Sequence, residues 1–537
     1  MTSIDTTRRH WLAASGFAAL LSFTIAPAAV AADPAQTQTQ TETQRLHALF
    51  DARWEAQMQR YPEWASHLGD TRYGDRLQDA SPAATAAGYA ATRETLARAQ
   101  AIARDPLAPV DQVSLDMFIY ELQEDLRYEP FAGYRSLSLG ALDGFQSNFA
   151  DLLTISPVAT GGQVEQVLAR IAAYPRRVDQ ELARLREGMR LGWVPPRNVL
   201  ERVLVQLDAL LAPAPEEGPF FTPFNQLGTD IPAAEQQALR ERARLAIAEQ
   251  VLVPLRRLRA FVADEYLRAA PSDGALSLYP QGAAVYAAAV QSQTTTTLSA
   301  AQIHAIGLRE MARLRAEMEA VQRKVGFTGD FAKFIAHLNT DPKFFHTGPE
   351  ALLAGYRDIA KRIDPELPRL FAVLPRAPYG VRAMPVHMSP DRAEYYDTPT
   401  LDGSRGGWFN ANVAAWRKRP IWAMETLVAH EAVPGHHLQV ARALELGELP
   451  KFRRTGVDVP FVSSEVDRYY SWPAQALGYM VGELKIIELR DRAKQKLGAR
   501  FDIRQFHSVV LDQGAVPLPV LERAVDAWVA SVVAAPR

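Results

Sequence analysis

Histidine and glutamate are concentrated in one short stretch, residues 430–437, which has the sequence HEAVPGHH. It holds three of the chain's 11 histidines, and Glu431 follows the first of them. A catalytic zinc ion is held by neutral imidazoles and carboxylates, with one coordination position left for water. The usual helical arrangement, H-E-x-x-H, places two imidazoles on one face with a general base between them. The stretch therefore predicts a zinc site in which His430 is a ligand and Glu431 is the general base.

Either His436 or His437 supplies the second imidazole. In an unbroken helix, His437 would face the same way as His430. Pro434 disfavours such a helix, because its ring clashes with the carbonyl group four residues earlier, which belongs to His430. We expect a bulge at Pro434 and Gly435 that brings His436 to the missing ligand position, and His437 stays open as the second ligand or as a group supporting the ligands. A proline-broken core helix with incidental histidines is the alternative interpretation.

The composition limits the chemistry that the rest of the chain can offer. The 537 residues are 48% hydrophobic and 22% charged, which is typical of a soluble globular protein. The net charge of −2 argues against a general nucleic-acid binder or a protein that binds anionic membranes. Because the chain has no cysteine, disulfides, thiolate metal sites and a cysteine nucleophile are excluded.

Residues 1–32 have the features of an export signal. Arg8-Arg9 precede an apolar run from Trp11 to about Ala26, and small residues suited to cleavage follow at 29–31. The run is too short for a comfortable membrane span. The paired arginines resemble the twin-arginine signal, whose route carries folded proteins, and a general secretory signal is the alternative. Both predict a periplasmic or secreted mature protein without a membrane span.

The residues after the signal are typical of a mainly α protein. Residues 33–43 form a polar, Gln- and Thr-rich stretch that we expect to be a disordered linker. Residues 44–298 have the pattern of an N-terminal region of helices separated by Pro and Gly. Within it, the apolar residues of 44–60 are spaced to bury one helix face.

A second, catalytic-type helical region is expected over residues 299–537. Ser299 and Gln302 form a capping box that predicts the start of a helix. Between residues 374 and 416, Pro, Gly, Tyr and Asn are dense, and residues 407–413 have the composition of a strand. The predicted fold is therefore a large helical body with a small β-sheet just before the metal-motif helix.

Several segments resemble the bacterial domain of unknown function 885 family. The matching words include Pro378–Arg382, Asp402–Gly406 and His430–Gln439, the last with the string H-E-x-x-P-G-H-H-L-Q. Weaker likeness extends from Leu68 to Leu518, nearly the whole mature chain. Such proteins are regarded as zincin-like metallopeptidases of mostly helical fold, largely uncharacterised in substrate. The resemblance implies a zincin-like fold and zinc-dependent cleavage of peptides.

The chain departs from the family pattern after the motif. Members usually continue with E-G-W-A-L-Y-A-E, whose first glutamate is the natural third zinc ligand, and later with R-L-V-x-D-T-G-x-H. Both segments are absent here, and Ser463 stands where the first glutamate is expected. This has the form of an internal deletion. Glu465 is the nearest carboxylate that could serve as the third ligand in its place.

Further residues are candidates for catalysis or substrate binding. Tyr469 could donate a hydrogen bond to the oxyanion, because the Arg468-Tyr469 pair resembles one that helical metallopeptidases place after their ligands, and Tyr479 is the second choice. Arg468 could instead bind a substrate carboxylate through two hydrogen bonds. Arg405 and Asn412 precede the motif helix, where zincins commonly present an edge strand to the peptide backbone. A helix-surface ion pair, a packed tyrosine and turn residues are the structural alternatives.

These observations predict a zinc-dependent peptide hydrolase that acts outside the cytoplasm through a metal-activated water. The alternative is a catalytically impaired pseudo-enzyme or binding protein of the same fold, because the family's third-ligand segment is missing. The motif does not separate amide from ester substrates.

Overall fold

The structure is a computed structural model that describes residues 41–141, 144–385, 393–400, 405–446, 449–454 and 472–536. Residues 42–537 belong to one structural unit. The predicted export signal, nearly all of the predicted linker, and the candidate residues Glu465, Arg468 and Tyr469 lie outside the described residues. The predicted boundary between residues 298 and 299 stays a prediction.

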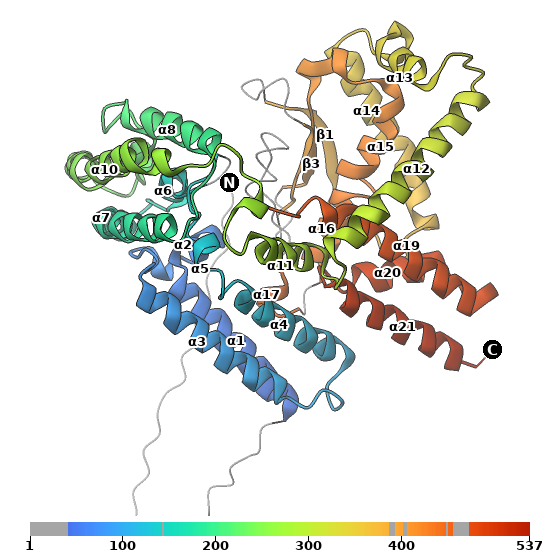
Figure 1. Cartoon of the computed structure of the whole chain (residues 1–537), viewed down its shortest axis with the longest axis horizontal. Coiled ribbons are helices and arrows are strands. Elements are labelled where there is room, and N and C mark those ends of the chain that lie inside the picture. The colour runs from blue at the N-terminus through green and yellow to red at the C-terminus, as the bar shows by residue number, and fades with distance from the viewer. Residues whose placement is uncertain are drawn as a thin grey trace, which may run out of the picture. The chain divides into compact units, whose positions relative to one another are not determined.

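The first part of the unit is helical, as its Pro and Gly punctuation predicts (Figure 1). The α-helices are α1 (Glu42–Arg60), α2 (Pro62–His67), α3 (Pro82–Gln100), α4 (Pro109–Arg127), α5 (Ala132–Arg135), α6 (Phe145–Ile155), α7 (Gly161–Arg190), α8 (Arg197–Leu211), α9 (Ala233–Ala246), α10 (Val253–Phe261) and α11 (Gly282–Thr294). Short 3₁₀ or π turns lie between them: η1 (Thr71–Tyr73), η2 (Pro219–Gln226), η3 (Ile247–Leu252), η4 (Val262–Tyr266), η5 (Leu267–Ala269) and η6 (Leu276–Leu278).

The second part contains the remaining helices and the sheet. The α-helices are α12 (Ala300–Lys324), α13 (Phe331–Thr340), α14 (Pro349–Ile363), α15 (Ile421–Glu431), α16 (His436–Leu444), α17 (Lys451–Arg454), α19 (Leu477–Leu497), α20 (Ile503–Leu511) and α21 (Leu518–Ala534). The 3₁₀ turns are η7 (Pro342–Phe344), η8 (Asp364–Arg369), η9 (Val413–Lys418) and η10 (Gly498–Arg500). The capping box predicted at Ser299 is present, since Ser299 Oγ accepts from Gln302 N and the Gln302 side chain accepts from Ser299 N. The prediction of a mainly α fold is confirmed.

The predicted small sheet is also present, with three strands among the described residues. They are β1 (Tyr379–Ala383), β2 (Tyr395–Asp397) and β3 (Gly407–Ala411), in the order β1-β3-β2. β1 runs parallel to β3, and β2 runs antiparallel to it. β3 is therefore the central strand, and its buried residues pack against the helices that precede and follow the sheet in sequence.

One hydrophobic cluster joins the sheet to the motif helix. It combines Leu352 and Tyr356 of α14, Phe409 of β3, and Met424 and Val428 of α15, all of which are almost fully buried. Figure 1 shows α14 and α15 beside β1 and β3. Burying a large apolar side chain contributes about 1.5–3 kcal/mol, so this cluster holds α15 firmly on the sheet. The C-terminal end of α15, which carries the motif, is thereby placed next to the strands.

Among the helices that the structure describes, none combines the length and the apolar composition needed to cross a membrane.

Candidate metal centre

The HEAVPGHH stretch forms two helices separated by a short break, as the proline predicts. α15 ends at Glu431, and α16 begins at His436. Gly435 lies in the break, packed against the last carbonyl groups of α15. A Cβ at this position would lie 2.0 Å from the His430 carbonyl oxygen and 2.4 Å from that of Ala429. The two helix ends can approach this closely only because residue 435 has no side chain.

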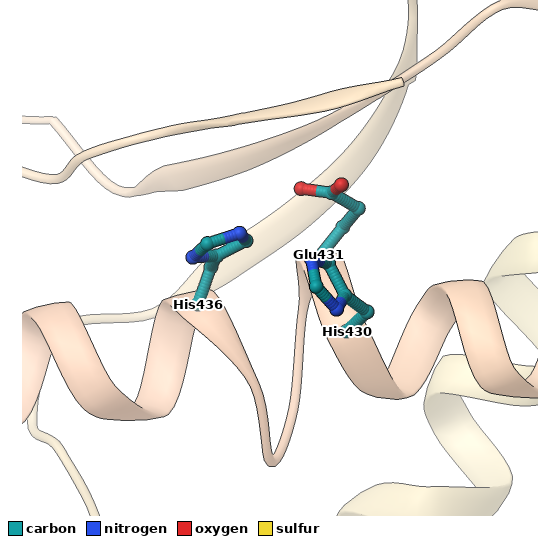
Figure 2. Close-up of side chains that lie close together, drawn as sticks. All are labelled: His430, Glu431 and His436. Carbon is teal, nitrogen blue, oxygen red and sulfur yellow. The ribbon is translucent and has the colours of Figure 1, made fainter. Parts of the chain in front are cut away.

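The break brings His430, Glu431 and His436 together (Figure 2). One ligand atom of each lies within 4.8 Å of the others. The two imidazole rings are perpendicular, with centroids 4.8 Å apart. Both histidines are exposed, while Glu431 is buried. The geometry thus favours the bulge interpretation, in which His436 and not His437 joins His430.

His437 points away from this group and supports it from behind. Its Nε2–H donates to the Ala377 carbonyl oxygen at 3.1 Å, because a carbonyl can only accept. Nδ1 therefore accepts the hydroxyl proton of Tyr396 at 2.9 Å. Burial lowers the pKa of His437, in keeping with a neutral ring. Because both ring nitrogens are hydrogen-bonded, His437 is not available as a zinc ligand. Of the two roles left open for it, the structure favours the group that supports the ligands, at the start of α16.

The support for His437 comes from the sheet and from the end of α16. Glu445, the C-cap of α16, accepts from Arg376 N at 2.6 Å and from Ala377 N at 3.3 Å, which fixes the carbonyl that His437 contacts. On the other side, a Cβ at Gly407 of β3 would lie 2.3 Å from the Tyr396 hydroxyl oxygen. Tyr396 and Glu445 thus hold the histidine in place. Apart from the density of tyrosines in this region, no sequence pattern points to Tyr396, because its partner His437 lies on a distant segment.

The electrostatic environment of Glu431 suits proton transfer. Burial raises the pKa of this carboxyl group to about 7, and the negative charge of Glu394 adds to the effect. Glu394 is itself buried and paired with Arg419, whose Nε lies 2.6 Å from Glu394 Oε1. A general base works best when its pKa lies near the operating pH. Although the residue is exposed, the ring of His436 is partly desolvated by its surroundings. This desolvation, together with the electrostatic effect of the nearby His430, lowers the pKa of His436, which favours the neutral imidazole that a metal requires.

The other predicted substrate-binding residues lie in different places. Arg405 is exposed. Burial raises the pKa of the Tyr396 hydroxyl, and the nearby positive charge of Arg405 partly opposes this shift. Asn412 is 2% exposed and its Oδ1 caps η9 by accepting from Ala415 N at 3.3 Å. The structure therefore corrects Asn412 to a structural role, because its side chain is not open to a substrate. Tyr479 lies on α19 and is 60% exposed.

The residues present fit a zinc ion in the type of their donors. Two imidazoles and a carboxylate are the groups that hold zinc in cysteine-free sites. No further histidine or acidic side chain joins the group within the described part of the chain. Glu431 can act as a base only if another group is the third ligand, and Glu465, predicted for that role, lies outside the described residues.

Replacing Gly435 with alanine is expected to weaken zinc binding by about 10–100-fold, the range found when support for metal ligands is lost. The added Cβ would overlap the carbonyl oxygen of His430, so the end of α15 must move and the two imidazoles separate. Such overpacking also costs about 1–3 kcal/mol of stability. Zinc titration with a chromophoric chelator measures the affinity. Gly482→Ala on α19 is the control, because nothing lies within 4 Å of its added Cβ. Unchanged zinc affinity in Gly435→Ala would contradict the geometry described above.

Comparisons with known proteins identify relatives but no established function. The structure is similar to that of a candidate lipoprotein from Colwellia psychrerythraea, with a TM-score of 0.77 and 21% identity over 91% of this chain and 100% of the other. It is also similar to a candidate lipoprotein of unknown function from Shewanella oneidensis, with a TM-score of 0.67 and 16% identity over 90% of this chain and 99% of the other. At these identities, the likeness establishes the fold alone. No curated protein matches the chain.

A family model matches the sequence in two segments, residues 62–461 and 454–525. The change from one segment to the other falls just before Glu465, where the sequence predicts an internal deletion. Together the two segments span most of the chain, so the protein belongs to the family described as bacterial protein of unknown function, DUF885.

Proposed function

We propose that this protein is a zinc-dependent peptide hydrolase. The observation that supports the proposal most directly is the approach of His430, Glu431 and His436, whose ligand atoms lie within 4.8 Å of one another across the helix break. Histidines that only fill space in a core are not expected to meet at an exposed position beside a buried carboxyl group, as His430 and His436 do. The two rings lie at right angles on opposite sides of the helix break, with the Glu431 side chain beside them (Figure 2).

Each residue has a distinct part in the proposed reaction. His430 and His436 would hold the metal. A bound zinc ion supplies a water of lowered pKa and polarises the substrate carbonyl group. Glu431 accepts a proton at its carboxylate and donates it to the leaving amine. His437 keeps α16, and with it His436, against β2 and β3 through Tyr396. Arg405, which is exposed near Tyr396, would contact a substrate in this proposal.

The second candidate function is that of a binding protein of the same fold without catalysis. It is favoured by one specific observation, the absence of the E-G-W-A-L-Y-A-E segment and its glutamate. A site with two imidazoles and no third ligand would bind zinc weakly, and Glu431 would then be drawn into coordination. The two candidate functions predict different effects of changing Glu431. In the hydrolase the change should abolish turnover, whereas in the binding protein it should lower the metal content.

We also propose that the mature protein acts in the cell envelope or outside the cell. The export signal over residues 1–32 supports this, as does the description of two structural relatives as candidate lipoproteins. Because the chain has no cysteine, a zinc site in it has to be built without thiolates in any compartment.

Metal content is the direct test of the proposed site. We expect the purified protein to carry about one zinc per chain, and His430→Ala and His436→Ala to lose it, because each removes one of few ligands. Inductively coupled plasma mass spectrometry after dialysis against a weak chelator measures the content. His304→Ala is the control, since His304 is exposed on α12 and outside the group. Zinc retained in both ligand variants, or no zinc in the wild type, would overturn the assignment.

A further inference from the structure

A large cavity lies in the N-terminal helical part of the unit, apart from the metal centre. Its volume is about 1330 Å³, and its walls come mainly from α1, α3, α5, α7 and the segments between them, with further residues from α8, the segment before α11, and Trp472 and Pro473. These helices are the blue to cyan-green elements of Figure 1. None of the three clustered residues His430, Glu431 and His436 lines it. Ligand pockets usually measure about 300–1,000 Å³, so the cavity has room for more than a simple inorganic ion.

Arginines outnumber acids among the lining residues that the structure describes. These residues include five arginines and four acidic residues. Every one of the four acids is paired with an arginine, in the ion pairs Arg53–Asp125, Arg93–Glu129, Arg177–Glu181 and Arg190–Glu187. Two of those arginines, Arg93 and Arg190, are not lining residues. Within the described part of the chain, Arg60, Arg135 and Arg184 are therefore left without a carboxylate partner.

These three guanidinium groups are held in place by neutral contacts. Arg184 donates from Nη2 to the main-chain oxygen of Arg135, and Arg135 donates from Nη2 to the Glu129 carbonyl oxygen at 3.0 Å. The guanidinium of Arg135 also lies 5.0 Å from the ring centroid of Tyr89. Arg60 lies flat on α3, where a Cβ on Gly88 would overlap its Nη1. Backbone oxygens and aromatic rings orient these cations, and none of the three forms an ion pair with a carboxylate among the described residues.

Two further observations favour an anionic ligand beside Arg135 and Arg184. Nε of Arg135 is buried and has no hydrogen-bond partner. An unsatisfied buried donor destabilises the folded state, and a ligand that accepts from it would remove that cost. Burial, together with the nearby positive charges of Arg177 and Arg135, lowers the pKa of Arg184 and outweighs the effect of Glu181. An anion placed between these groups would relieve the repulsion.

We propose that this cavity binds an organic anion bearing several carboxylate or phosphate groups, with Arg135 and Arg184 as its principal contacts and Arg60 as a third. A guanidinium group presents a planar fork of donors that matches both carboxylate and phosphate oxygens. Tyr61, Tyr89 and Tyr134 line the same space and offer ring faces and hydroxyl groups to the body of the ligand. The proposal does not depend on the metal centre.

Citrate and inorganic phosphate are suitable probes, measured by isothermal titration calorimetry on the full chain at probe concentrations up to about 1 mM. We expect saturable citrate binding that is tighter than phosphate binding and that weakens as sodium chloride is raised. Arg184→Gln is expected to lower the citrate affinity at least about 10-fold, the loss typical of one charge-assisted contact. Arg184→Lys keeps the positive charge and should therefore retain most of the citrate affinity. Binding by this variant would show that residue 184 can be changed without loss of the fold.

Arg186→Gln is the matched control, since Arg186 lies two residues away on α7, is exposed, and is not a lining residue. Its citrate affinity should equal that of the wild type, as should that of Glu431→Gln. The proposal is overturned if citrate does not bind, if phosphate binds as tightly as citrate, or if Arg184→Gln and Arg186→Gln behave alike. Because Glu431→Gln leaves the cavity intact, failure here and failure of the proposed hydrolase activity are distinguishable.

Discussion

Replacing Glu431 with glutamine is expected to lower kcat for peptide hydrolysis by about 10³-fold, within the 10²–10⁴-fold range for loss of a general acid–base. The carboxylate is the only described acidic group beside the two clustered histidines. Its pKa of about 7 lets it accept a proton near neutral pH and return it to the leaving amine. Glutamine has nearly the same shape but cannot accept the proton. Turnover of a quenched-fluorescence peptide library measures the effect.

The control is Glu425→Gln on the same helix, whose carboxylate is exposed and paired with Arg362 on the surface. It should have wild-type kcat and zinc content. The zinc content of Glu431→Gln should also stay near one per chain, because His430 and His436 remain. If zinc is lost together with activity, Glu431 is a ligand, and the general-base role is wrong. If the wild type holds zinc but cleaves no peptide in the library, the non-catalytic candidate is favoured.

Local sequence patterns were sufficient to predict much of the fold around the site. Ser299 and Gln302 predict the start of α12 because a capping box depends on residues three positions apart. Pro434 predicts the break between α15 and α16 for a similar reason, since its clash involves the carbonyl group of His430, four residues earlier. The strand β3 follows from the composition of residues 407–413. Each of these signals acts over a few residues.

The features that the sequence could not predict depend on contacts between distant segments. Whether His437 is a ligand was decided by Tyr396 and Ala377, which lie 41 and 60 residues away. Asn412 was predicted to bind substrate because of its position before the motif helix, whereas the fold buries it as a cap. Glu394 raises the pKa of Glu431 from a separate segment and belongs to no recognisable motif. Only the folded structure brings these groups together.

The burial of Glu431 also has a consequence for stability. Without metal, the pKa of this carboxyl group is about 7 in the folded protein and 4.5 when exposed to water. A raised pKa means that the folded state binds the proton more tightly than the unfolded state does. The stabilisation from the protonated carboxyl group is complete below about pH 4.5 and is lost as the pH rises through about 7. The metal-free wild type should thus become less stable across this range.

Glu431→Gln removes the charge at every pH. It should therefore raise the free energy of unfolding above that of the wild type far more at about pH 8 than at about pH 5, and the two increases should differ by about 3 kcal/mol. Urea unfolding of the metal-free proteins, followed by tryptophan fluorescence, measures this difference, since Trp408 and Trp416 lie in and next to the sheet below α15. Glu425→Gln reports any general effect of removing a carboxylate from α15. Added zinc should abolish the difference, because a cation beside the carboxylate favours its charged form. Equal effects of Glu431→Gln at both pH values would show that the carboxyl group is hydrated in solution, and the pH dependence of the site would then require another cause.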